Sequence, residues 1–193
     1  CDYVFVGDKI IEFDIPGTLG IIYNHKTWLQ QKHKERVYPF IQASDYLKGI
    51  ELSDKMNMIY ACLSDISEAF ITKVKTDKTA VLLIDSWNSH GMAEQRRLII
   101  ELMNNNCDVP VIIGRAYRNL TTEQLQLHCA TDMGALLTDG LGDGIELDYI
   151  KDIKKLVRRI EYASIFPPKT LDELENSIRS FDKVQNNEQG NLR

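Results

Sequence analysis

Apolar residues occur in this chain as short continuous runs, and from Met56 onward these runs alternate with longer segments of helical pattern. A continuous apolar run indicates a strand that is covered on both faces, because a strand with one solvated face alternates apolar and polar residues. We therefore predict four buried parallel strands. They are expected at residues 58–62, 80–84, 109–113 and 135–137.

Helical segments separate these runs, at residues 66–75, 92–103 and 122–133. Asp65 or Ser64 is expected to cap the first helix, and Thr121 with Gln124 has the spacing of a capping box at the third. Strand and helix together recur at the length of a βα unit. The fold class predicted is α/β, with repeated βα units that form either an open parallel sheet or an incomplete TIM-like barrel.

The first third of the chain has a weaker pattern. Strand-like runs at residues 3–6, 10–13 and 19–23 are separated by Gly7-Asp8 and Pro16-Gly17, which are typical turn sequences. Four large aromatic residues follow without a sustained period, and we expect them to pack against the regular part. They are Trp28, Tyr38, Phe40 and Tyr46.

After residue 147 the pattern changes to that of an amphipathic helix at residues 149–162. Its apolar stripe lies opposite a basic face formed by Lys151, Lys154, Lys155, Arg158 and Arg159. A solvated surface helix is the ordinary explanation of such a face, and a docking site for an acidic protein such as ferredoxin is the alternative. Pro167-Pro168 ends this stretch, residues 170–181 predict a further helix, and we expect the polar residues 185–193 to be disordered.

Composition narrows the class of protein. The 193 residues carry 28 acidic and 23 basic side chains, a formal charge of -5, and so lack the basic excess that nucleic-acid binding requires. There is no apolar run of about 20 residues, so we expect no membrane insertion and a cytoplasmic location.

The chain begins at Cys1 and enters directly into a strand-like run, which favours an excised piece of a larger protein.

The most distinctive local feature is a glycine-rich loop that follows the predicted strand at residues 135–137. Glycines at alternate positions permit positive φ and close approach of a ligand, and ligands of α/β proteins lie at the carboxyl ends of strands. Either a ligand loop or a conformationally demanding turn fits this pattern. The candidate residues are Asp139, Gly140, Gly142, Asp143 and Gly144.

A second polar group, residues 85–90, follows the predicted strand at residues 80–84. Ser86 and His90 suggest a nucleophile with a base, but no nucleophile-elbow sequence surrounds the serine, and a polar loop with a helix cap fits better. Arg115 and His90 are candidate anion contacts. The four cysteines are scattered without a CxxC pair, which argues against a zinc site, an iron–sulfur site and a disulfide scaffold. No group of residues has convergent support as a site, so we predict no metal site, no bound cofactor and no catalytic residue in this chain.

Three segments resemble a known family. Residues 91–97 (GMAEQRR), 109–112 (VPVI) and above all 130–145 (ATDMGALLTDGLGDGI) are similar to the middle part of the extended 4-hydroxy-3-methylbut-2-enyl diphosphate synthases of plants, chlamydiae and Bacteroidetes. The opening residues 2–7 also resemble the entry to the insertion domain of that family. The resemblance extends over about residues 1–147, and after that the chain departs from the family pattern.

The resemblance implies a three-part parent enzyme of non-mevalonate isoprenoid biosynthesis. Such an enzyme has a catalytic (β/α)8 barrel, a barrel-like insertion, and a carboxyl-terminal domain with a [4Fe–4S] cluster. It reductively opens 2-C-methyl-D-erythritol 2,4-cyclodiphosphate with electrons from ferredoxin or flavodoxin. Neither the substrate-binding residues nor the cluster cysteines of the family match residues of this sequence, so no catalytic residue is transferred.

The favoured hypothesis is therefore a structural insertion domain at residues 1–147, followed by a helical segment at residues 148–184 and a tail at 185–193. Its partners would be the catalytic barrel and the cluster domain of the same polypeptide. The alternative hypothesis is a free-standing α/β protein that binds an anion or a diphosphate with the loop Asp139 to Gly144.

Overall fold

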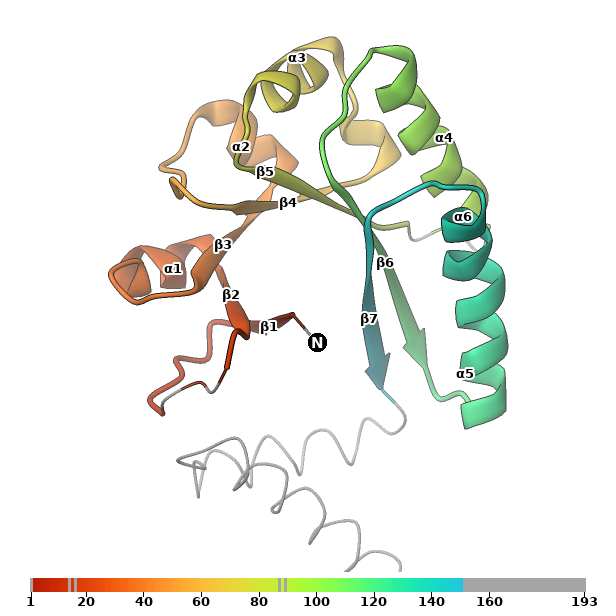
Figure 1. Cartoon of the computed structure of the whole chain (residues 1–193), viewed down its shortest axis with the longest axis horizontal. Helices are drawn as coiled ribbons and strands as arrows, with labels where there is room; N and C mark the ends of the chain where they lie inside the picture. Colours follow the sequence, from red (N-terminus) through yellow and green to blue (C-terminus); the bar gives the residue numbers. More distant parts are fainter. Residues whose placement is uncertain (1, 14, 16, 87, 89, 151–193) are drawn as a thin grey trace, which may run out of the picture.

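In the described part of the chain, seven parallel strands form a curled sheet, a half-barrel with helices on its outer, convex side (Figure 1). The computed structural model describes residues 2–13, 15, 17–86, 88 and 90–150. The strands are β1 (Tyr3–Gly7), β2 (Gly20–Asn24), β3 (Val37–Gln42), β4 (Asn57–Ala61), β5 (Ala80–Ile84), β6 (Val111–Arg118) and β7 (Gly144–Ile150). The predicted α/β fold with repeated βα units is confirmed.

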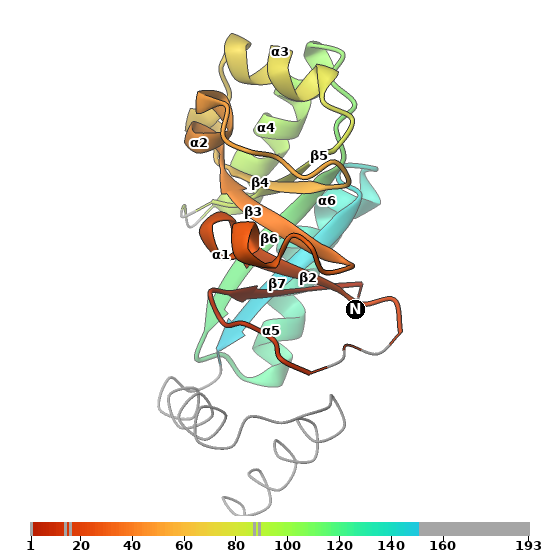
Figure 2. The ribbon, with the colours of Figure 1, turned by 90° about the vertical axis from the view of Figure 1, so that its left-hand side faces the viewer.

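The strands follow one another across the sheet in sequence order, so β1 and β7 form its two edges. The side view shows the strand direction rotating from β1 to β7, which is the twist that parallel strands adopt (Figure 2). The main helices between strands are α1 (His25–Gln31), α2 (Ala43–Lys48), α3 (Glu68–Thr76), α4 (Gly91–Asn104) and α5 (Thr122–Cys129). Short helical turns complete the connections: η1 (Leu63–Asp65), the π-helical η2 (Ala130–Gly134) and α6 (Ala135–Thr138).

The core lies between the convex face of the sheet and these helices. Side chains paired across a parallel ladder point to the same face, and the convex set includes Ile59, Leu82 and Ile113, all fully buried. Phe70 of α3 and Leu98 of α4 are buried in the same cluster. The convex face of these strands is buried under helices, and the concave face of the same strands also carries apolar side chains. Apolar residues on both faces give the continuous apolar runs in the sequence.

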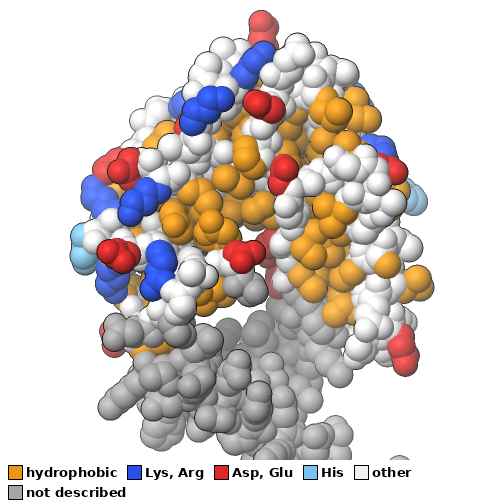
Figure 3. All heavy atoms as spheres, viewed as in Figure 1, with side chains coloured by type: hydrophobic (Ala, Val, Ile, Leu, Met, Phe, Trp, Pro, Cys, Tyr) orange, Lys and Arg blue, Asp and Glu red, His pale blue; other side chains and the backbone are white. Residues whose placement is uncertain are grey.

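The concave face carries a row of aromatic rings. The ring centroids of Phe5 and Phe40 are 4.9 Å apart, and those of Phe40 and Tyr60 are 5.8 Å apart. The space-filling view shows apolar side chains gathered along this hollow (Figure 3). The large aromatic residues that lacked a sequence period therefore divide between two faces, because Trp28 and Tyr46 are buried on the helical side.

Three predicted strands differ from the structure, and β3 and β7 were not predicted. Residues 135–137 are helical, as part of α6, and the last described strand is β7, which begins at Gly144. The strand expected at 109–113 begins at Val111 and continues to Arg118. Residues 10–13 contain no strand, whereas β3 forms at residues for which no strand was predicted.

The predicted helix starts agree with the structure in part. Ser67 caps α3, accepting a hydrogen bond from the backbone of Phe70, whereas Asp65 and Ser64 lie in η1. The capping box of Thr121 and Gln124 at α5 is confirmed. The strand β7 includes Tyr149 and Ile150, with which the predicted helix 149–162 was expected to begin. The rest of that helix and the predicted tail lie outside the described residues.

Candidate functional site

The polar residues after β5 form a hydrogen-bonded loop that leads into α4. The backbone N–H of Ser86 donates to Asp85 Oδ1 over 2.7 Å, and that of Asn88 donates to Ser86 Oγ over 3.1 Å. The backbone N–H of His90 then donates to Asn88 Oδ1 over 3.0 Å. These bonds satisfy the backbone as it turns from strand to helix, in agreement with the predicted polar loop. The predicted helix cap is wrong, because the N-cap residue of α4 is His90 and no side chain caps the helix.

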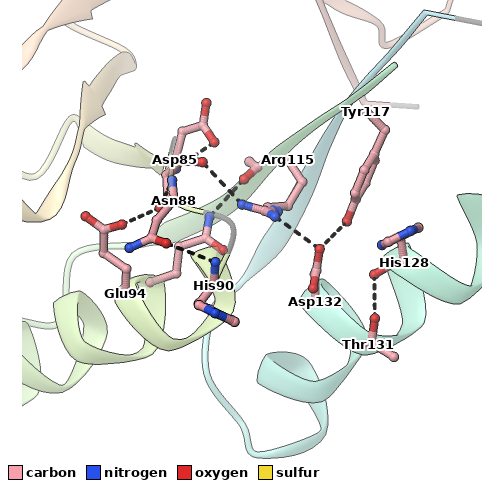
Figure 4. Close-up of polar contacts among 12 residues, drawn as sticks. Asp85, Asn88, His90, Glu94, Arg115, Tyr117, His128, Thr131 and Asp132 are labelled. Carbon is pink, nitrogen blue, oxygen red and sulfur yellow. Dashed lines mark hydrogen bonds and ion pairs between the residues drawn. The ribbon is translucent and has the colours of Figure 1, made fainter. Parts of the chain in front are cut away.

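The same loop does not form a nucleophile with a histidine base. The Ser86 hydroxyl donates to the carboxylate of Glu94, one turn inside α4. Figure 4 shows the His90 ring directed away from this bond. Ser86 is also buried, so its oxygen is not presented to a substrate. A serine held in this way positions the loop.

Arg115, a candidate anion contact that follows the strand expected at residues 109–113, lies instead in the middle of β6, on the convex face. Its guanidinium donates to the backbone oxygen of Ser86 and to the carboxylate of Asp132 from η2, each over 3.2 Å (Figure 4). Only 11% of its side chain is exposed. Asp132 thus already occupies the position at Arg115 where an external anion was expected.

Tyr117 completes this cluster. Its hydroxyl donates to Asp132 over 2.8 Å, and its ring lies 5.7 Å from that of His128 (Figure 4). Burial, and then the hydrogen bond to the carboxylate, raise the pKa of Tyr117 well above its ordinary value. The tyrosine therefore stays protonated and acts as a donor. The cluster ties β6 to η2 and to the loop after β5. No local sequence pattern indicates it, because Asp132 lies 17 positions and Ser86 29 positions from Arg115.

A group of carboxylates on the concave face was also missed. Glu146 of β7 is half-buried, and its side chain shares a face with Asp148 two residues later. Burial, followed by repulsion from Asp148 and Asp85, raises the pKa of Glu146 to about 7, and Arg118 partly offsets this. Arg118 pairs with Asp148 over 2.6 Å. The alternation of Glu146 and Asp148 with apolar residues was a strand signal that could have located them.

The glycine-rich loop lies at the opposite end of the sheet from His90, whereas Arg115 is in the middle of β6. It connects α6 to β7 and therefore precedes a strand, because the run assigned as a strand before it is helical. Asp143 exchanges two hydrogen bonds with the backbone of Val111, and Asp139 pairs with Arg96. Gly140 and Gly142 have positive φ, as the sequence predicted for a demanding turn. The structure does not bring this loop together with the two candidate anion contacts.

Within the described residues, no three His, Cys, Asp or Glu side chains are grouped so that they could hold a metal ion. Cys107 is buried, and Cys62 and Cys129 are half-buried free thiols. No helix of the described part is long and apolar enough to cross a membrane.

Comparison with known proteins gives relatives in a single enzyme family. The 4-hydroxy-3-methylbut-2-en-1-yl diphosphate synthase (flavodoxin) of Parabacteroides distasonis is 30% identical over 146 residues, which are 76% of this chain and 23% of the relative. The proteins of the same name from Bacteroides thetaiotaomicron and Phocaeicola vulgatus are 31% and 28% identical over similar lengths. No family model and no solved structure matches the chain.

The chain spans about a quarter of the length of these relatives, so the match is to a segment of each. The match to the Parabacteroides distasonis protein includes 146 residues, and this length agrees with the predicted extent of the resemblance, about residues 1–147. The predicted resemblance is therefore confirmed, and this chain is homologous to a segment of the 4-hydroxy-3-methylbut-2-en-1-yl diphosphate synthases.

Proposed function

We propose that this chain is a structural insertion domain of a 4-hydroxy-3-methylbut-2-en-1-yl diphosphate synthase. The observation that carries the proposal is the match to only 23% of relatives that bear the name of a complete enzyme. A segment of that size is one domain of a larger protein. The parent enzyme would reductively convert 2-C-methyl-D-erythritol 2,4-cyclodiphosphate, with a [4Fe–4S] cluster in another domain and flavodoxin or ferredoxin as electron donor in the cytoplasm.

The shape of the half-barrel supports a spacing role. All strands are parallel, so the chain enters β1 at the amino end of one sheet edge and leaves β7 at the carboxyl end of the other. The sheet between them is rigid because its convex face is packed against helices over most of its width. A domain of this kind fixes both the distance and the direction between the segments that it joins.

The polar clusters fit a structural role as well. Arg115 is hydrogen-bonded to Asp132 and Ser86, and Tyr117 to Asp132, so the cluster connects β6, η2 and the loop after β5. Catalytic groups, in contrast, converge on an open site with perturbed pKa values. Glu146 has such a pKa, yet its neighbours are further carboxylates and an arginine already paired with Asp148. Little in this arrangement favours the alternative of an independent anion-binding protein.

A chimera tests the proposal. In the Parabacteroides distasonis synthase, the matched segment is replaced either by this chain or by a flexible Gly/Ser linker with the same number of residues. We expect the first chimera to turn over the cyclodiphosphate. The linker variant should keep its iron–sulfur absorbance but lose at least ten-fold in kcat, because the separation of the flanking parts is no longer fixed. Full activity of the linker variant, or turnover by this chain alone, would overturn the spacing role.

A further inference from the structure

Aromatic rings and carboxylates form one continuous surface on the concave face of the half-barrel. The rings of Phe5, Phe40 and Tyr60 follow one another from β1 to β4, with centroids 4.9 Å and 5.8 Å apart. The Tyr60 hydroxyl then donates to Asp85 Oδ2, at the end of β5, over 3.5 Å. Asp85 is in turn close enough to Glu146 of β7 for the two carboxylates to repel each other. We call this surface, together with Asp148, the concave stripe.

Glu146 lies at the acidic end of the concave stripe. It pairs in register with Gly114 of β6, and a Cβ built on this glycine would lie 3.4 Å from Glu146 Oε2, so the carboxyl group rests over the glycine backbone. Among the described residues, Glu146 makes no hydrogen bond and no ion pair, because the nearby Arg118 is already paired with Asp148 over 2.6 Å. The carboxylates of Glu146, Asp148 and Asp85 thus exceed the positive charge of Arg118, and this end of the stripe is negative.

Aromatic rings beside carboxylates are a combination that binds organic cations. The face of an aromatic ring attracts an ammonium or guanidinium group, and a carboxylate adds a charge-assisted hydrogen bond. A cation at the acidic end would also relieve the repulsion that Asp148 and Asp85 exert on Glu146. The same repulsion disfavours an anion there. The charge of the concave stripe therefore selects a partner that carries lysine or arginine.

The length of the stripe indicates what kind of partner carries the cation. The stripe crosses the sheet from β1 to β7, and seven strands at the usual spacing extend over roughly 30 Å. A free amino acid or polyamine would contact only a part of this length, whereas an extended peptide of about nine residues matches it. The stripe is also open, since Phe5 is 50% exposed and the Asp148 side chain 49% exposed, and the space-filling view shows it along the hollow (Figure 3).

We propose that the concave stripe binds an extended segment of a partner protein that contains lysine or arginine, with its cationic groups against the carboxylates and the faces of the aromatic rings. The half-barrel would thus serve as a docking platform in addition to fixing the distance between the segments that it joins. This inference goes beyond the spacing role, because that role depends on the ends of the sheet and not on its concave face.

Fluorescence anisotropy with a labelled basic peptide tests the docking. The probe is a peptide of about nine alternating arginine and alanine residues, the length of the stripe, added to the 193-residue chain at pH 8 and low ionic strength. At this pH Glu146 is ionised, because its pKa is about 7. We expect saturable binding that weakens as salt is added, since salt screens the charges. The same peptide with citrulline, the uncharged analogue, in place of every arginine should not bind.

Two double variants of equal net charge locate the binding surface. Glu146→Gln with Asp148→Asn neutralises the acidic end of the stripe and should weaken binding at least about five-fold. Glu101→Gln with Glu123→Gln neutralises two exposed carboxylates on α4 and α5 and should change the affinity less than about two-fold. Phe40→Leu keeps an apolar side chain without the ring and should weaken binding about three-fold. Circular dichroism checks that each variant is folded.

Cross-linking to the unsubstituted protein does not depend on how the variants fold. A benzophenone at the centre of the peptide should label β3 to β6, and labels confined to α3, α4 or α5 would overturn the proposal. Equal weakening in the two double variants would do the same, because the peptide would then respond only to net charge. So would the absence of saturable binding at low salt. Arginine amide that binds as tightly as the peptide would make a small organic cation the occupant instead. None of these outcomes changes the result expected for the chimera, so the docking and the spacing role fail separately.

Discussion

Gly91 and Arg115 are packed so closely that no side chain larger than hydrogen fits between them. A Cβ atom built on Gly91 would lie 1.9 Å from Arg115 Nη1 and 2.7 Å from Cζ. Gly91 is the first residue of α4, and Arg115 is in β6, so this contact sets how closely the helix approaches the sheet. The guanidinium is held on its other sides by Ser86 and Asp132.

Gly91→Ala is therefore expected to destabilise the protein by about 1–3 kcal/mol, the usual cost of overpacking. The guanidinium would have to leave at least one of its two partners to make room for the methyl group. Urea denaturation followed by circular dichroism measures the loss. Gly134→Ala is the control, because the nearest atom to its added Cβ is 3.8 Å away and a helical alanine is favourable. Equal stability of Gly91→Ala and the wild type would contradict the packing argument.

Asp132→Asn should also destabilise the fold, by about 1–3 kcal/mol, because the buried guanidinium of Arg115 loses its counter-ion. Tyr117→Phe removes a single hydrogen bond to the same carboxylate and keeps the ion pair, so it should cost about 1 kcal/mol or less. Chemical denaturation of both variants compares them directly. A larger loss for Tyr117→Phe than for Asp132→Asn would show that the ion pair contributes little.

The pattern of apolar runs was sufficient to predict the parallel α/β fold, because strands packed under helices need apolar residues on both faces. It failed at residues 135–137, where three apolar residues belong to a helix. Leu136 is buried there, while Leu137 is 41% exposed. A run shorter than one helical turn fits either periodicity. The true strand, β7, was missed because its convex face is exposed and its concave face carries Glu146 and Asp148.

The candidate site was less predictable for a related reason. Placing the loop Asp139 to Gly144 at the carboxyl end of the sheet depended on the strand assigned before it, so one wrong element moved the loop to the wrong end. Arg115 was placed after the strand because the apolar run that predicts this strand ends at Ile113, whereas β6 continues to Arg118. Its partner Asp132 comes from a helix that packs against β6, and such tertiary pairs have no local sequence signature.

Stability should fall as the pH rises from about 4.5 to about 7, through the titration of Glu146. Its pKa in the folded protein is about 7, above the ordinary value of 4.5, so the folded state binds this proton more tightly than the unfolded chain does. The stabilising contribution is complete below pH 4.5 and is lost as the pH passes 7. Because the side chain is half-exposed, solvent screening limits the effect to about 1–2 kcal/mol.

Glu146→Gln tests this expectation, since a neutral amide cannot titrate. The variant should show a smaller decrease in unfolding free energy between pH 5 and pH 7.5 than the wild type, as measured by urea denaturation at several pH values. Glu123→Gln is the control, because Glu123 is exposed at the start of α5. If Glu146→Gln and the wild type have the same pH profile, burial and the carboxylates of Asp148 and Asp85 do not raise the pKa of Glu146 as inferred.

The two glycines with positive φ in the loop before β7 should respond differently to alanine. Both substitutions force a side chain into the left-handed region, which costs about 1–2 kcal/mol. At Gly140 no atom lies within 4 Å of the added Cβ, so we expect no loss of stability beyond this backbone strain. At Gly142 the Cβ would lie 2.7 Å from Ile113 Cδ1, a core atom that cannot move freely, and we expect a further loss of about 1–3 kcal/mol. Thermal unfolding of the two variants measures the difference, and equal midpoints would show that the core yields at Ile113.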